Sequence, residues 1–335
     1  MSMPTDRGTP SMPADAVVPA SSAARPGWRR APEWVALLLF LLAEVAFFSW
    51  GSPCFLSWAN WVNILTALSI AGLLAAGGTV LLIAGQFDLS VGSGVAFVAL
   101  VLAMAAPVAG LPAATVLALL IGLLIGALNG FLVTVVGVNA LITTLGTLAI
   151  FRGLTQSVGG GRNMIVSGFD WAIARPFLSI PVAALVFLVV AALVAVVLSR
   201  TVFGRSIYAI GANENAARLV GIRTKRTVFA AFVLSGAFIG LAGLLSASQL
   251  GSTSGTTGLG LELAVVTAVI LGGTSLKGGT GTILGTVLGL LIVGVLSNGL
   301  TLMNINSTWQ QVATGTLLIL AVSFDQLRQR LTQAR

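Results

Sequence analysis

The sequence of 335 residues contains no histidine, one cysteine (Cys54) and only 8% charged residues. The absence of histidine rules out a histidine-based metal site, a catalytic histidine and a Cys–His nucleophile pair, and one cysteine cannot form an intramolecular disulfide. A soluble domain carries roughly 25% charged residues to cover its surface. The composition therefore excludes a cytosolic enzyme, a nucleic-acid-binding protein and a secreted domain, and it indicates neither a metal ion nor another cofactor.

Hydrophobic residues, in contrast, make up 57% of the chain, and the mean hydropathy is +1.03. Both values are far above those of a water-soluble protein and predict a membrane protein. The net charge is +8, with 17 basic residues. In so apolar a chain we interpret these residues as signals of membrane topology rather than as contacts to nucleic acid.

The chain divides into a polar start, a long apolar region and a short polar end. Residues 1–32, rich in proline, alanine, serine and threonine, are predicted to be a disordered cytoplasmic tail, and residues 326–335 a cytoplasmic C-terminal tail. Residues 33–325 contain apolar runs of the length a helix needs to cross a bilayer, about 20 residues. They predict an all-α, polytopic membrane helix bundle of ten helices, over residues 33–50, 62–83, 91–109, 112–136, 140–157, 179–199, 227–247, 261–275, 280–302 and 308–325.

The distribution of lysine and arginine predicts the orientation of these helices, because the cytoplasmic flanks of transmembrane helices are enriched in basic residues. With the N-terminus in the cytoplasm, 14 of the 17 basic residues lie on the cytoplasmic side, six of them in the loop 200–226. Arg162 and Arg175 lie on the opposite side. Both termini are therefore predicted to be cytoplasmic, which requires an even number of helices.

A weak internal repeat links the middle and the end of the chain. Asn129-Gly130 recurs as Asn298-Gly299, at an offset of 169 residues, and neighbouring motifs recur at nearly the same offset. The two copies run in opposite directions in the predicted topology, so the matches predict an inverted repeat, an architecture found in many transporters. The alternative is chance similarity between helices rich in glycine and leucine.

The 40 glycines allow helix backbones to approach closely, which is how helices pack in lipid. Nine of them are assigned to helix packing: Gly72, Gly77, Gly78, Gly122, Gly126, Gly236, Gly240, Gly285 and Gly289.

The segment 85–93 (Gly-Gln-Phe-Asp-Leu-Ser-Val-Gly-Ser) places Asp88 between two apolar runs, where the helix must break. A carboxylate at the centre of a helix in lipid costs about 2.5–3.5 kcal/mol on insertion scales, so it should face a protein interior, a cavity or the interface. We expect Asp88 or Ser90 to cap the helix that begins near Val91. Direct contact with a solute is the alternative, and the two roles can coexist because the free N–H groups of a broken helix can face a cavity.

Asparagine and glutamine side chains on the predicted helices are candidates for a polar lining. Each can donate and accept a hydrogen bond, which matches sugar hydroxyls. Asn129 and Asn298, on the repeated helices, are the best candidates. The predicted pathway residues are Asp88, Ser90, Asn129, Thr144, Asn298 and Gln310. Hydrogen bonds between helices are the alternative role at each position.

The loop 200–226 contains the pattern of a short capped helix over Asn213–Val220. Asn213 is the N-cap, Glu214 is in the first turn, Arg218 is late, and Gly221 ends the helix. Such a helix suits docking into a groove of a partner protein, and an ordinary basic connector is the alternative. The predicted docking residues are Gly211, Asn213, Glu214, Ala216, Ala217, Arg218, Leu219 and Gly221. No phosphate-binding loop of the G-x-x-x-x-G-K-[ST] type occurs, so the chain is not expected to hydrolyse ATP itself.

Four stretches of this sequence resemble the membrane-spanning permease subunits of bacterial ABC sugar importers of the ribose, xylose and galactose type: Gly85–Ser93, Thr144–Gly153, Phe203–Asn213 with Val220–Ile222, and Ala268–Gly281. The resemblance extends over about residues 35–325, although Gln86 and Phe87 stand where Gly-Ile is more usual. It implies an inner-membrane pathway formed by two permease chains, either two copies or a close paralogue. It also implies a periplasmic sugar-binding protein, and a separate ATPase that docks on the loop 200–226 and acts through the helix 213–220.

An ion-coupled secondary transporter is the main rival hypothesis. Its basis is the charged residues in or near the predicted spans, Glu44, Asp88, Arg152 and Glu262, together with the predicted inverted repeat. Proton relays often use histidine, which is absent. A membrane enzyme is disfavoured because the sequence contains no metal-ligand cluster and no activated nucleophile.

Overall fold

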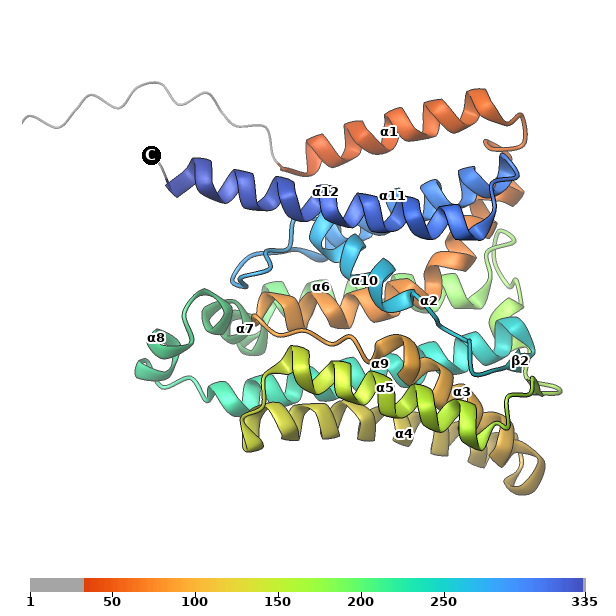
Figure 1. The fold of residues 1–335 in the computed structure, drawn as a ribbon, viewed down its shortest axis with the longest axis horizontal. Helices are drawn as coiled ribbons and strands as arrows, with labels where there is room; N and C mark the ends of the chain where they lie inside the picture. The colour runs from red at the N-terminus through yellow and green to blue at the C-terminus, as the bar shows by residue number, and fades with distance from the viewer. Residues whose placement is uncertain (1–32, 334–335) are drawn as a thin grey trace, which may run out of the picture. The chain divides into compact units, whose positions relative to one another are not determined.

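The computed structural model describes residues 33–333, so the predicted tail over residues 1–32 lies outside the described residues. The described chain is a bundle of α-helices (Figure 1). The helices are α1 (Glu33–Gly51), α2 (Trp58–Ile83), α3 (Val91–Ala109), α4 (Leu111–Phe131), α5 (Ala140–Val158), α6 (Val182–Arg200), α7 (Val202–Ala212), α8 (Glu214–Leu219), α9 (Thr224–Leu250), α10 (Leu261–Leu271), α11 (Ile283–Leu302) and α12 (Ser307–Gln333). A π-helix, η1 (Leu132–Val136), and a 3₁₀ turn, η2 (Trp171–Ile173), complete the helical elements, and β1 (Met164–Ile165) pairs antiparallel with β2 (Ser252–Thr253).

The prediction of an all-α membrane bundle is confirmed. Within residues 33–333, six helical segments are long and apolar enough to cross a membrane: α2, α3, α4 with η1, α6, α9 and α11. α10 has only 11 residues and spans about 17 Å, roughly half a bilayer core. Each of the ten predicted spans coincides with a helix, but the number of membrane crossings stays a prediction.

Several helix ends differ from the predicted ones for identifiable reasons. The predicted span 261–275 ends at Leu271, because Gly273 adopts a positive φ of 85° that ends the helix. The predicted span 308–325 continues as helix to Gln333, since the charged residues that follow leave the apolar pattern without breaking a helix. α7 was not predicted at all, and it fills the first half of the loop 200–226.

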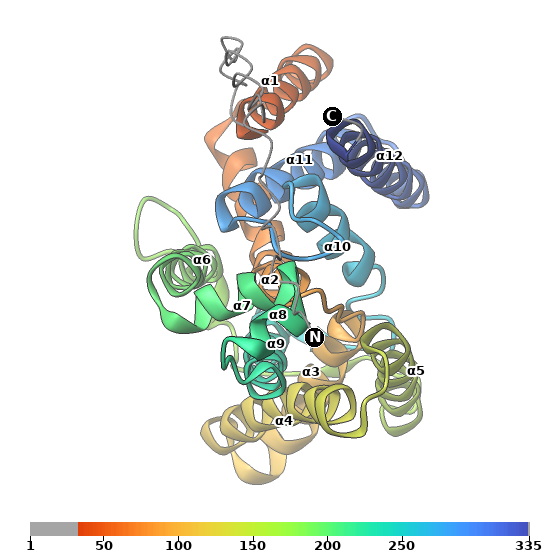
Figure 2. The ribbon, with the colours of Figure 1, turned by 90° about the vertical axis from the view of Figure 1, so that its left-hand side faces the viewer.

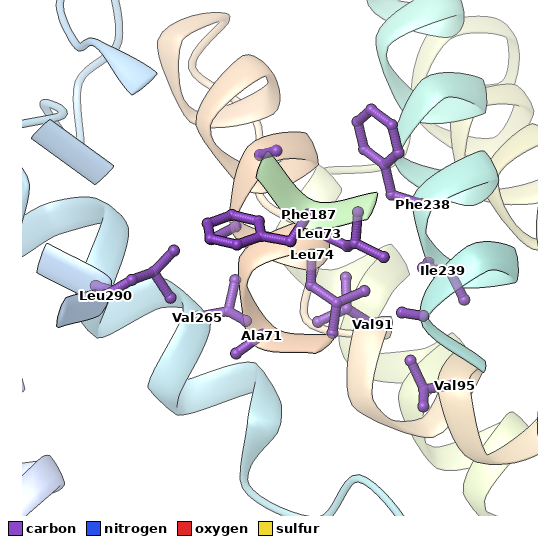
Figure 3. Close-up of a cluster of buried hydrophobic side chains, with 14 of the residues drawn as sticks. Ala71, Leu73, Leu74, Val91, Val95, Phe187, Phe238, Ile239, Val265 and Leu290 are labelled. Atoms are coloured by element: carbon purple, nitrogen blue, oxygen red, sulfur yellow. The ribbon is translucent and has the colours of Figure 1, made fainter. Parts of the chain in front are cut away.

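α2 and α9 are the inner helices of the bundle, and α4 and α6 lie further out (Figure 2). Figure 3 shows the centre of the core, where Leu73 and Leu74 of α2 lie among side chains of α3, α6, α9 and α10. Phe187 of α6 packs where Gly72 leaves room on α2. The inner position of α2 explains why its sequence is apolar on nearly every face.

α4 and α9 pack with their backbones in contact along a stripe of glycines. A Cβ atom on Gly122 would lie 2.5 Å from the Cα of Gly240, and one on Gly126 would lie 2.8 Å from the Cα of Gly236. Gly285 and Gly289 of α11 likewise face the backbone of Gly272 and Ala268. The packing role predicted for these glycines is therefore confirmed.

Replacing Gly236 with alanine should lower the thermal stability of the purified protein, since the new methyl group would meet backbone atoms of Gly122 and Gly126 that cannot move aside. Overpacking of this kind costs about 1–3 kcal/mol. Gly146→Ala, on α5, is the matched control, because open space surrounds that position and alanine favours a helix. Melting in detergent should show a loss for Gly236→Ala alone; equal melting temperatures would contradict this packing.

The order of elements repeats in the two halves of the chain. α2 and α9 end at Ile83 and Leu250, and α5 and α12 begin at Ala140 and Ser307, both pairs 167 residues apart. α3 packs against α4 and α5, and α10 packs in the same way against α11 and α12. The end of α2 lies beside α7, at the same end of the bundle as the start of α9, so the two copies are antiparallel. These observations support the predicted inverted repeat and extend it to α2 and α3.

Candidate functional site

Two non-helical chain segments interrupt the bundle, and the second lies against the start of the helix that follows the first. Residues 84–90 run as non-helical chain from α2 to α3, and residues 251–260 run from α9 to α10 (Figure 1). The second segment meets the first turn of α3, because a Cβ on Gly258 would lie 2.6 Å from the carbonyl oxygen of Gly92; this contact is called the crossing below. The N-termini of α3 and α10 therefore lie close together, an arrangement that transporters use to place free N–H groups at a central site.

Asp88 is the centre of a buried hydrogen-bond network in the first of these segments. Its Oδ1 accepts from the backbone N–H of Ser90 at 3.0 Å and from the Ser90 hydroxyl at 2.6 Å, and its Oδ2 accepts from the Ser235 hydroxyl at 3.2 Å. Ser235 is the twelfth residue of α9, so Asp88 lies about 17 Å along that helix. The network thus ties the break after α2 to the middle of α9.

The predicted cap at the start of α3 is wrong in its details. Ser90 occupies the N-cap position, but no side chain accepts a hydrogen bond from the first turn of the helix. Asp88 accepts from the N–H of the N-cap residue itself, two residues along the chain, rather than from the first turn of α3. Its contribution is to hold the break in place rather than to satisfy the helix end.

Asn129 belongs to the same network. Its side chain is fully buried on α4, and its Nδ2 donates to the Ser90 hydroxyl at 2.9 Å. Its Oδ1 has no hydrogen-bond partner among the described residues. A cavity of about 20 Å³ borders Asp88, which is room for one water molecule and not for a sugar. In this conformation Asp88, Ser90 and Asn129 therefore form a closed polar centre.

The second segment carries two charged side chains close to the same crossing. Arg152, on α5, donates from Nη1 to the carbonyl oxygens of Gly255 at 3.0 Å and Thr257 at 2.7 Å. Glu262 accepts from the N–H of Gly260 through Oε1, and its Oε2 has no hydrogen-bond partner in the described part of the chain. Both side chains remain partly exposed, and no ion pair joins them. The charged residues near the crossing thus include two that the predicted pathway set omitted.

Asn298 lies apart from this centre, on α11. It exchanges hydrogen bonds with Asn60 of α2, at 2.9 and 3.0 Å. It also borders a groove of about 360 Å³ between α2, α10 and α11, with Asn63, Ser297 and Thr301 as further polar side chains. The groove is large enough for a small ligand, and Asn298 is one of its polar lining residues.

Thr144 and Gln310 make local hydrogen bonds. The Thr144 hydroxyl donates to the carbonyl oxygen of Ala140 in its own helix at 2.9 Å. Gln310 donates to the Thr301 hydroxyl at 2.9 Å and so joins α12 to α11. The structure does not bring these two side chains into the network around Asp88, and the six predicted pathway residues do not form a single site.

The short helix predicted in the loop 200–226 is confirmed as α8. Asn213 caps it by accepting from the N–H of Ala216 at 3.0 Å, and Gly221 follows it with a φ of 86°. Glu214 and Arg218 form an exposed ion pair at 3.0 Å. Such an (i, i+4) pair stabilises a surface helix by a few tenths of a kcal/mol.

Two residues of the predicted docking set, Ala217 on α8 and Gly211 on α7, pack against other parts of the bundle. Ala217 is only 3% exposed and packs inward, whereas Leu219 and Val220 are 88% and 77% exposed. Gly211 lies on α7 and faces the backbone of Ile83 and Gly279, so it is a packing residue. Asn213, Glu214, Ala216, Arg218 and Leu219 of the predicted set are exposed, and their docking role stays a prediction.

α7 connects α8 to two other parts of the bundle, a role that the sequence did not indicate. Next to Gly211, the N–H of Gly279 donates to the carbonyl oxygen of Ile83 at 2.8 Å. The Tyr208 hydroxyl donates to the carbonyl oxygen of Gly281 at 2.8 Å. Burial raises the pKa of the Tyr208 phenol, so it remains a donor at physiological pH. α7 thus contacts both the end of α2 and the loop between α10 and α11.

A bundle of apolar helices with two non-helical breaks, after which α3 and α10 begin close together, is the architecture of a polytopic membrane transport protein. The family described as branched-chain amino acid transport system / permease component matches residues 60–322, and the chain belongs to this family.

Individual relatives agree with this assignment. The ribose import permease protein RbsC of Bacillus subtilis is 40% identical over 86% of this chain and 90% of its own length. The L-arabinose transport system permease protein AraH of Escherichia coli is 40% identical over 83% of this chain and 86% of its own length. The D-allose transport system permease protein AlsC of Escherichia coli is 37% identical over 86% of this chain and 90% of its own length. No solved structure matches this chain significantly.

Proposed function

We propose that this chain is the membrane-spanning subunit of an ATP-binding-cassette importer that moves a monosaccharide, or a similar polyol-like solute, across the inner membrane. Relatives named for ribose, arabinose and allose transport support the solute class. Alternating access, driven by a separate ATPase subunit, is the proposed transport step. The chain itself contributes the pathway and no ATPase site.

The observation that carries this proposal is α8. Its cap, its ion pair and its glycine stop make it a rigid helix of only six residues, and its exposed end carries two large apolar side chains, Leu219 and Val220. Exposed apolar groups on a fixed helix are typical of a docking surface. In an importer of this class the partner that occupies it is the ATPase.

The proposed assembly contains further partners. A second permease chain, either a copy or a close paralogue, completes the pathway, and a periplasmic binding protein delivers the solute. Both termini are proposed to be cytoplasmic, with α7 and α8 on that side, because the loop 200–226 holds six of the chain's basic residues. No nucleic acid takes part.

The proposed pathway passes the crossing, where residues 251–260 meet the start of α3. Asn298 contributes to it through the groove between α2, α10 and α11. Asp88, Ser90 and Asn129 support the pathway from within by fixing the break before α3. The amide and hydroxyl groups along the groove suit a neutral solute with several hydroxyls, because they donate and accept without a buried charge.

Uptake into right-side-out membrane vesicles containing the chain, its ATPase and its binding protein should depend on internal ATP. It should not change when an uncoupler is added while internal ATP is held constant, because no ion gradient drives the step. Abolition of uptake by the uncoupler would favour the ion-coupled alternative. The structural feature that supports this alternative is the presence of Arg152 and Glu262 near the crossing.

A further inference from the structure

Two adjoining cavities lie at the end of the bundle that carries α8. One of about 340 Å³ is lined by Arg218, Ile222, Arg223, Thr224, Lys225 and Arg226. The other, of about 480 Å³, is lined by Phe131, Thr134, Val135, Lys225, Arg226 and Phe229. Lys225 and Arg226 belong to both cavities, so the two form one groove with a basic part and an apolar part.

Three of the four cations that line this groove form no ion pair within the described chain. Glu214 is the single acidic residue in the loop 200–226, and it is paired with Arg218. Arg223, Lys225 and Arg226 make no ion pair within the described chain, and their side chains are exposed. Three adjacent cations without a counter-charge create a positive potential that favours an anionic ligand.

The apolar part lies on the outer surface of the bundle. Phe131 and Val135, at the end of α4 and in η1, are 48% and 62% exposed, and α4 with η1 is among the least buried of the membrane-crossing segments. Gly130 lets the side chain of Phe229 approach, since a Cβ at Gly130 would lie 3.1 Å from the Phe229 ring. The slot therefore opens toward lipid and has aromatic and aliphatic walls.

We propose that this groove binds one anionic phospholipid of the adjacent leaflet. The phosphate group lies at Arg223, Lys225 and Arg226, and an acyl chain lies along Phe131, Val135 and Phe229. A soluble anion would use only the basic part, and an acidic protein surface would not fill a slot that faces the membrane. Basic pockets next to the ends of membrane helices are suited to such head groups, because the charges and the bilayer surface reinforce each other.

Native mass spectrometry of the purified full chain tests this, with dioleoylphosphatidylglycerol and dioleoylphosphatidylcholine as probes. The first phosphatidylglycerol should bind about tenfold more tightly than phosphatidylcholine, and the double variant Lys225→Gln/Arg226→Gln should lose about tenfold for phosphatidylglycerol alone. Arg200→Gln/Arg205→Gln is the control, since it removes the same charge from exposed positions that line neither cavity. It should change binding less than about twofold.

A second pair of variants tests the acyl-chain slot. Val135→Trp should fill the slot and weaken phosphatidylglycerol binding, whereas Val116→Trp, at a similarly exposed position near the other end of α4, should not. Equal affinity for the two lipids would overturn the proposal, as would an equal loss in both charge variants. Displacement by millimolar inorganic phosphate would show an anion site without a lipid. Unchanged lipid binding, with loss of ATPase association in the Lys225/Arg226 variant, would show a protein interface instead.

Discussion

Replacing Leu219 and Val220 with aspartate should reduce ATP-dependent uptake to background, while the chain still inserts and folds. Both side chains project from α8 with most of their surface exposed, so the change removes no internal packing. In the proposed complex they are buried against the ATPase, and two carboxylates there would have to lose their water without a partner. Losses at the centre of a protein interface reach several kcal/mol, which corresponds to a decrease of about 100-fold or more.

The measurement separates docking from folding. ATPase activity of the assembled complex, uptake and the melting temperature of the purified subunit are compared for the double variant and for Val202→Asp. Val202, on α7, is exposed and apolar but lies outside α8, so its variant controls for the added charge. Normal uptake in the Leu219/Val220 variant would remove α8 from the coupling mechanism. Ala217 is unsuitable for this test, because it is buried and a change there would disturb the fold.

α8 could be predicted from the sequence because its determinants are local. Asn213, Glu214, Arg218 and Gly221 lie within nine residues, and each acts on a neighbouring backbone group or side chain. The burial of the Ala217 side chain could not be predicted in the same way. Which face of a six-residue helix is buried depends on the elements it packs against, α7 and α9, and the local pattern does not contain that information.

The crossing, in contrast to α8, depends on contacts between residues far apart in the sequence. The sequence indicates a break near Asp88, since polar residues and glycine interrupt an apolar run. The contact between Gly92 and Gly258 joins positions 166 residues apart, and the Asp88–Ser235 hydrogen bond joins positions 147 apart. No pattern within a helix specifies such contacts. The sequence therefore indicated polar residues of the network, such as Asp88, Ser90 and Asn129, but not which of the predicted pathway residues contact one another.

In α4 and α9 the spacing of glycines indicates close helix packing but does not identify the partner helix. Glycines spaced four apart, such as Gly122 and Gly126, predict a close helix contact, which is confirmed. The same spacing recurs at Gly236 and Gly240 on the partner helix, but the sequence does not state that these two stripes meet. Pairing between helices is a property of the folded bundle, where the glycine stripes of α4 and α9 fit each other.

Asp88→Ala should destabilise the chain strongly, and Asp88→Asn should not. Alanine leaves the N–H of Ser90 without an acceptor in a buried site and removes the acceptor of two hydroxyl groups. The hydroxyls can rotate to other acceptors, but the fixed N–H cannot, so a cost of about 2–4 kcal/mol is expected. Asparagine keeps one oxygen for Ser90, and its amide can donate to the Ser235 hydroxyl, so every hydrogen bond of the network can form.

Melting in detergent and uptake in the assembled importer test both variants, with Ser235→Ala as the control that removes a single hydrogen bond of the same network. The melting temperature of Asp88→Asn should be close to that of the unchanged chain. That of Ser235→Ala should be slightly lower, and that of Asp88→Ala the lowest. Uptake by Asp88→Asn should remain within about twofold, because the role of Asp88 is to hold the break before α3 by accepting hydrogen bonds. A stable Asp88→Asn chain that transports nothing would show that the negative charge itself is required, and the buried network would then belong to the transport step rather than to the scaffold.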